Sequence, residues 1–187
     1  MKNDLSLYLP VRSQMRTGDL LQWHSNSVLG KMIRAKTHKD RPKYEVENDI
    51  NVNHSSLVIC LKEVESGDLR IHTNEAMEKG TVPAFLSVRL QQFDGHVWWY
   101  PLNDEIEGTF NVDRVKIGRN AFEYLGVGYD YWAIAKKLVN IKTRIDIRKL
   151  FCNEYCSVCY GVRMGAVARS PNAMPRLHIH KTPIMIL

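Results

Sequence analysis

The sequence predicts a single α+β domain in which a small antiparallel sheet packs with helices. Two observations carry this prediction. A hairpin pattern places strands at residues 56–61 and 69–73, and segments with helical spacing lie on either side of it, at 27–35 and 151–162. A chain of 187 residues with 44% hydrophobic and 25% charged residues has the length and composition of one globular domain.

The N-terminal segment is predicted to lead into the first strand of the sheet. Residues 1–17 are mostly polar and are predicted to be extended. Gly18 and Asp19 form a turn signal, and the apolar residues that follow predict a short strand over 20–23.

A helix is predicted over residues 27–35, with Ser27 as its N-cap. The polar segment 37–53 is predicted to be a loop, and its length is typical of a functional loop. The apolar positions that give the helical spacing are Val28, Leu29, Met32 and Ile33.

The centre of the chain is predicted to form the rest of the sheet. The nearly continuous apolar run 56–61 is typical of a strand buried on both faces. A turn at 66–68 leads to the return strand 69–73, and 75–80 is predicted to be a loop. A third strand is predicted over 97–102.

The later segments are predicted to be mainly helical. Residues 88–92 fit neither pattern clearly, whereas 112–125 predicts a helix that Gly126 ends. Residues 131–139 predict another helix, and the apolar stretch 184–187 predicts a strand or a docked tail.

The cysteine pattern is not that of a disulfide scaffold, since the chain has only four cysteines. Cys156 and Cys159 form a CxxC, which we interpret as two small buried side chains on the helix predicted over 151–162. A zinc site would need a second ligand pair, and only His178 and His180 offer one, with an unusual one-residue gap. We therefore expect no metal and no cofactor.

The net charge of +6 from 26 basic and 20 acidic residues favours an anionic surface, such as a membrane, a wall polymer or a nucleic acid. The basic residues lack interleaved aromatic side chains, so no specific nucleic-acid binding is predicted. No apolar run is long enough for a transmembrane segment. The N-terminus has no signal-peptide pattern, so we expect a cytoplasmic protein.

Cys152 is the strongest candidate for a catalytic residue, because it lies at the predicted start of a helix. Free N–H groups there favour a thiolate, which is the reactive form of cysteine, and can also hold an oxyanion. A cysteine hydrolase also needs a base and an orienting polar group. His54 precedes the buried strand, and Asn74 or Glu75 follows the strand predicted to pair with it.

Six short segments carry a resemblance to a known family. They occur in the family's order at residues 18–21 (GDLL), 53–59 (NHSSLVI), 74–76 (NEA), 90–100, 126–131 (GVGYDY) and 151–155 (FCNEY). Together they resemble the permuted papain-like hydrolases related to NlpC, in particular the YiiX-like branch found in phage and bacterial genomes. The resemblance implies a circularly permuted papain-like fold over the whole chain.

The resemblance also implies roles for individual residues. Cys152 would be the nucleophile, His54 the base and Glu75 the residue that orients the imidazole. Tyr129 would line the site, and Asp130 would cap the following helix. Permutation accounts for a histidine and an acid that precede the cysteine along the chain.

Some alternatives stay open at this point. Cys156 followed by Ser157 also fits the family's cysteine motif in a register shifted by four residues, and His72 is a second candidate base. The family's activity implies a peptidase or amidase on cell-wall-type peptides, or an acyl-lipid hydrolase. A non-catalytic binding or structural protein is the other hypothesis. The host would be a bacterium or a phage-infected cell, and a virion is a second location.

Overall fold

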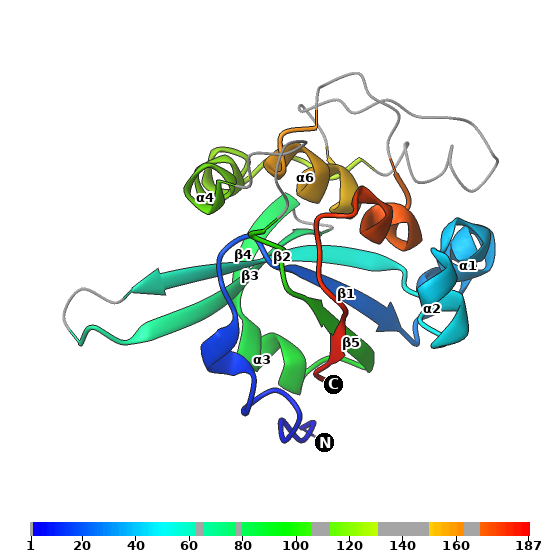
Figure 1. Ribbon diagram of the computed structural model, residues 1–187, viewed down its shortest axis with the longest axis horizontal. Helices are drawn as coiled ribbons and strands as arrows, with labels where there is room; N and C mark the ends of the chain where they lie inside the picture. The colour runs from blue at the N-terminus through cyan, green and yellow to red at the C-terminus, as the bar shows by residue number, and fades with distance from the viewer. Residues whose placement is uncertain (1, 63–65, 78–79, 106–112, 131–149, 163–168) are drawn as a thin grey trace.

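A computed structural model of the chain contains one antiparallel sheet of six strands (Figure 1). The strands pair in the order β4-β3-β2-β1-β5-β6, which confirms the α+β class and the antiparallel sheet. The structure describes residues 2–62, 66–77, 80–105, 113–130, 150–162 and 169–187. The strands are β1 (Leu20–Ser25), β2 (His54–Lys62), β3 (Leu69–Met77), β4 (Gly80–Phe85), β5 (Gly95–Tyr100) and β6 (Ile184–Met185).

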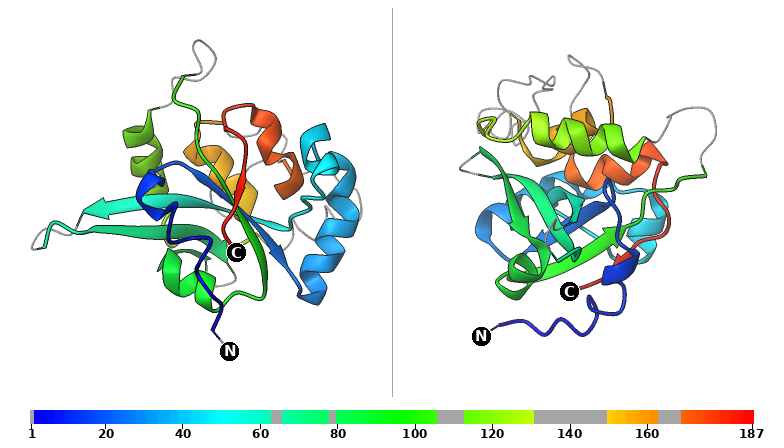
Figure 2. Two further views of the ribbon diagram at one scale, coloured as in Figure 1. Left: turned by 60° about the horizontal axis from the view of Figure 1, so that its bottom comes forward. Right: turned by 90° about the vertical axis from the view of Figure 1, so that its left-hand side faces the viewer.

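Helices cover both faces of this sheet. The views in Figures 1 and 2 place α4, α6 and η3 over one face, whereas α3 and the N-terminal segment lie against the other. None of the helices described is both long and apolar enough to cross a membrane. The helices are η1 (Arg12–Gln14), α1 (Val28–Thr37), η2 (His38–Asp40), α2 (Lys43–Glu47), α3 (Leu86–Gln91), α4 (Arg114–Glu123), α6 (Cys152–Cys159) and η3 (Pro171–Leu177).

Two hydrophobic clusters fill the space on the two sides of the sheet. Successive residues of a strand point to opposite faces, so each central strand contributes to both clusters. In β2, Leu57 and Ile59 pack with α6, whereas Val58 packs with the side chains of α3. In β1, Leu20 belongs to the cluster that contains α6, and Leu21 belongs to the cluster that contains α3. This double burial explains the nearly continuous apolar run in β2.

The hairpin of β2 and β3 is confirmed, and β3 is longer than predicted. The register pairs Leu57 with Asn74 and Ile59 with His72. Residues 75–77 and Gly80 are not in a loop as predicted, because β3 continues to Met77 and pairs with β4, which begins at Gly80. The second neighbour strand supplies hydrogen bonds that the sequence of β3 alone does not reveal.

The turn before β1 is confirmed and is held by a buried network. Gly18 has a φ of +92°, in the left-handed region that favours glycine. Asp19 is buried, and its carboxylate accepts hydrogen bonds from Trp99 Nε1 at 2.8 Å and from the Leu102 amide at 3.0 Å. Arg114 Nη1 pairs with the same carboxylate at 2.8 Å. These contacts tie the start of β1 to β5 and α4.

Two predicted coil segments contain more structure than expected. The segment 37–53 is not simply a loop, because it holds η2 and α2. The lead-in was predicted to be extended, but it contains η1, and its Tyr8 and Met15 are buried in the cluster that faces α3. Single apolar residues in a polar segment give no periodic pattern, so their burial depends on tertiary contacts.

The other predicted helices and strands are found, with shifted ends. The segment 112–125 contains α4, the segment 151–162 contains α6, and β6 lies within 184–187. The unassigned segment 88–92 belongs largely to α3. The helix predicted over 131–139 lies outside the described residues.

Candidate active site

Cys152 is the first residue of α6, and its side chain is only 4% exposed. The helix starts here because Glu154, at the third helical position, reaches back with Oε2 to accept the Phe151 amide at 3.3 Å. The first N–H groups of a helix have no partner within the helix, so those at the start of α6 are available to an anion. Cys152 Sγ donates to Asn153 Oδ1 at 3.6 Å.

His54 and Glu75 meet across the β2–β3 pair. The antiparallel register puts Glu75 diagonally opposite His54 on the same face of the sheet. His54 Nε2 lies 2.9 Å from Glu75 Oε2. The Cys152 side chain also interacts with this imidazole.

The charged forms of His54 and Glu75 stabilise each other. Burial disfavours the charged imidazole, but the Cys152 sulfur and the Glu75 carboxylate outweigh it and raise the pKa of His54 to about 9. Burial also opposes ionisation of Glu75, yet His54 and Arg89 together hold the pKa of Glu75 below its usual value. The site therefore favours an imidazolium between a carboxylate and a sulfur at neutral pH.

Arg89 on α3 is a site residue that the sequence reasoning missed. Its Nε lies 3.0 Å from Glu75 Oε1, and its guanidinium lies over the rings of Trp23 and Phe93, at 5.0 and 5.2 Å from their centroids. This stacking orients the planar guanidinium towards the carboxylate. Residues 88–92 gave no clear secondary-structure pattern, so the sequence offered no signal for this contact.

We expect Arg89→Met to destabilise the fold by about 3 kcal/mol, because it removes one partner of a buried carboxylate. Glu75 is 2% exposed and would keep only His54 as a charged partner. Urea unfolding at pH 7 measures the loss. Arg119→Met is the matched control, since Arg119 is exposed on α4. Equal stability of the two variants would show that the Arg89 ion pair contributes little.

A cleft opens beside the sulfur. Cys152, Tyr129 and Phe151 contribute to its lining. Tyr129 thus shares a cleft with Cys152. Asn153 also lines it, and its buried Nδ2 has no hydrogen-bond partner among the described residues.

Cys152, His54 and Glu75 therefore come together from α6, β2 and β3. No protein-family model and no curated protein matches this chain. The geometry places a sulfur, an imidazole and a carboxylate in series, with an arginine behind the carboxylate. Such a series is the arrangement that nucleophilic catalysis by a cysteine requires.

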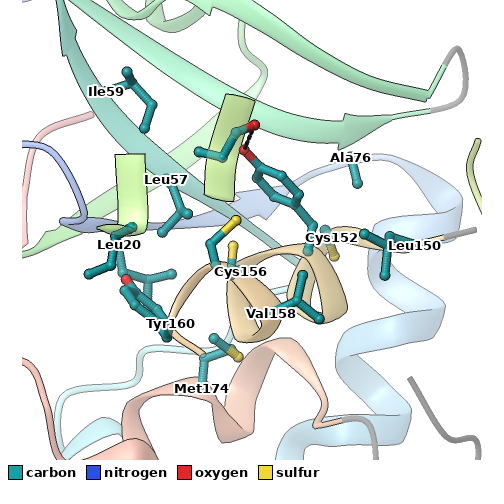
Figure 3. Packing of buried hydrophobic residues seen from close by; sticks show 14 of the residues in the cluster. Leu20, Leu57, Ile59, Ala76, Leu150, Cys152, Cys156, Val158, Tyr160 and Met174 are labelled. Atoms are coloured by element: carbon teal, nitrogen blue, oxygen red, sulfur yellow. Dashed lines mark hydrogen bonds between the residues drawn. The ribbon is translucent and has the colours of Figure 1, made fainter. Parts of the chain in front are cut away.

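The other described candidate residues do not contact His54. Cys156 is one turn further along α6 and is fully buried in the cluster that contains Leu57 and Tyr160 (Figure 3). Burial raises the pKa of its thiol well above the usual value. Burial likewise raises the pKa of Cys159. His72 stacks on Phe85, with ring centroids 4.5 Å apart. None of these three side chains contacts His54 in any interaction found among the described residues.

The residues considered above as zinc ligands do not form a metal site among the described residues. His180 Nε2 lies 3.1 Å from the Tyr160 hydroxyl, and burial lowers the pKa of His180 to about 3. Cys156 and Cys159 are free buried thiols. In the part of the chain that the structure describes, no three His, Cys, Asp or Glu side chains are grouped as metal ligands.

Proposed function

We propose that this protein is a thiol hydrolase that cleaves an amide or ester bond through a thioester intermediate. Cys152 is the nucleophile, His54 is the general base and acid, and Glu75 orients the imidazole. The observation that carries the proposal is the continuous contact from Cys152 to His54 to Glu75, together with a raised pKa for His54. Cys152 also lines a cleft, as a nucleophile must.

The reaction has two steps. The Cys152 sulfur attacks the carbonyl carbon, and the proton held by His54 passes to the leaving amine or alcohol as its bond to carbon breaks. The acyl group is then bound to Cys152 as a thioester. Water gives a proton to His54 and attacks the thioester carbon, which releases the carboxylic acid and restores the thiolate–imidazolium pair. Backbone N–H groups at the start of α6 stabilise the oxyanion in both steps.

We propose a circularly permuted papain-like fold of the NlpC type as the scaffold. The order of His54, Glu75 and Cys152 along the chain supports this, as does a helix that begins with the cysteine and packs on β2 and β3. The cysteine comes last, as permutation requires.

The proposed substrates are those that the family resemblance implies. They are cell-wall-type peptides, cleaved by a peptidase or amidase, or acyl lipids, cleaved by an acyl-lipid hydrolase. The cleft supports an apolar group beside the scissile bond, because Ile33, Phe151 and Pro171 line it. Lys36 at the same cleft supports an anionic group on the substrate, such as a carboxylate or a phosphate.

Alkylation by iodoacetamide, followed by mass spectrometry between about pH 5 and pH 10, tests this proposal without knowledge of the substrate. We expect Cys152 to react fastest of the four cysteines, because the His54 imidazolium stabilises its thiolate. In His54→Ala the rate near pH 6 should fall at least about tenfold, because the cationic partner of the sulfur is lost.

The pH dependence gives a second check. A pKa of about 9 means that His54 is protonated below this pH and loses its proton above it. The difference between the wild type and His54→Ala should therefore be largest at neutral and acidic pH and disappear above about pH 9. Cys156 and Cys159 serve as internal controls, since both are buried. Similar rates for all cysteines, or no effect of His54→Ala, would refute the proposed site.

A further inference from the structure

Helix α1 is oriented with its apolar side chains towards solvent. Ser27 caps it as predicted, since its side chain accepts the Gly30 amide. Yet Val28, Leu29 and Met32, which were expected to mark a helix by their spacing, are 77%, 51% and 52% exposed. The buried residues of this helix are Gly30 and Arg34. The usual amphipathic arrangement is therefore reversed.

Specific contacts hold α1 in this orientation. Arg34 Nη1 donates to the Ser25 carbonyl and, at 3.2 Å, to Asn53 Oδ1. A side chain at Gly30 would place its Cβ 2.8 Å from the same Ser25 carbonyl oxygen, so only glycine permits this close approach to the end of β1. Rotation of the helix to bury its leucine would break these hydrogen bonds and expose Arg34.

Helix α1 itself carries basic residues and no acidic residue. Between Asp19 and Asp40 the chain contains no acidic residue, whereas Lys31, Lys36 and Lys39 lie on or directly after α1. Lys31 is exposed between the exposed apolar residues. We define the α1 face as Val28, Leu29, Lys31 and Met32.

We propose that the α1 face docks on an anionic lipid bilayer. A helix that lies in the membrane interface combines apolar side chains, which enter the acyl boundary, with lysines that meet phosphate headgroups. A nucleic acid or a wall polymer would match the charge but would leave the three apolar side chains in water. A bilayer with anionic headgroups accommodates both, so charge and apolarity together favour this partner.

The position of α1 gives the docking a consequence for the cleft. Ile33, Lys36 and Thr37 of α1 line the cleft that contains Cys152. Figure 1 shows α1 and α2 at one end of the sheet and α4 at the other. A protein docked through α1 would hold its cleft at the membrane surface. Docking itself does not depend on the hydrolase proposal.

Co-sedimentation with vesicles tests the docking. The probes are vesicles of phosphatidylcholine alone and vesicles in which about a third of the lipid is phosphatidylglycerol. We expect binding to the anionic vesicles, with a fall of at least about tenfold in the double variant Leu29→Ser, Met32→Ser, because two partly exposed apolar side chains no longer enter the lipid. Lys31→Glu should reduce binding by about tenfold through reversal of one charge.

Matched controls come from α4, at the other end of the sheet. Val115→Ser and Lys116→Glu alter an exposed apolar residue and an exposed lysine there, and both should bind as the wild type does. All substituted residues are exposed, and circular dichroism will verify that each variant folds. Cys152→Ser should bind vesicles fully, so a failure of docking and a failure of the hydrolase proposal can be told apart.

Three results would overturn the docking proposal. The first is an absence of binding to anionic vesicles at low ionic strength. The second is binding that Leu29→Ser, Met32→Ser leaves unchanged, which would indicate charge attraction alone, as for a polyanion. The third is a dimer in analytical ultracentrifugation that the double variant converts to a monomer, which would make a second copy of the chain the occupant of the α1 face.

Discussion

Cys152→Ala is expected to abolish the burst of 4-nitrophenolate that the wild type releases from a 4-nitrophenyl ester, with turnover reduced by at least about 10⁴-fold. A burst reports acylation, and alanine offers no atom to acylate. Cys152 combines contact with His54 and a place in the cleft lining, so no other described thiol has the same surroundings.

Cys156→Ala is the matched control, because it removes the same atom one turn further along α6. Cys156 is fully buried, and burial raises the pKa of its thiol, so its removal should leave the burst intact. A burst that survives in Cys152→Ala but is lost in Cys156→Ala would move the nucleophile by one turn. A burst that neither variant changes would remove the thiol mechanism altogether.

His54→Ala is expected to reduce ester turnover by about 10³-fold, in the range found for the loss of a general base. The midpoint of thermal unfolding should fall by no more than it does in Arg89→Met, because Arg89 still pairs with the buried Glu75 carboxylate. A large loss of turnover in a variant that is still folded at the assay temperature identifies a catalytic histidine. Turnover and thermal unfolding are measured on the same preparation.

His72→Ala is the control for this variant, since His72 lies on the neighbouring strand and was the second candidate base. It stacks on Phe85, and we expect its removal to leave turnover within about twofold of the wild type. Comparable losses in His54→Ala and His72→Ala, or a collapse of stability in His54→Ala, would argue that His54 supports the fold.

Much of the fold could be predicted because its signals are local. The apolar run of β2 and its return strand gave the hairpin, and Ser27 gave the start of α1. The start of α6 was also visible, because a cysteine, a glutamate and apolar residues follow one another at helical spacing. These patterns depend on neighbours in sequence, so they survive without knowledge of the tertiary structure.

The rest depended on contacts between distant segments. Glu75 was expected at the start of a loop, but β4 pairs with β3 and places it within a strand. Arg89 reaches Glu75 from a segment with no clear pattern, and it is held by Trp23 and Phe93. The outward orientation of α1 follows from the hydrogen bonds of Arg34, which periodicity cannot reveal.

The central place of α6 has a consequence for synthesis of the chain. All eight residues of α6 are buried, and the helix covers β2 and β3, which the ribosome produces much earlier. Until α6 emerges, the apolar residues that pack against it, among them Leu57 and Ile59, lack its cover. Translation that pauses before this helix would thus leave an intermediate with exposed apolar surface. Such an intermediate is prone to aggregate and would benefit from a chaperone. The same pause would leave His54 and Glu75 without the thiol that they are proposed to serve.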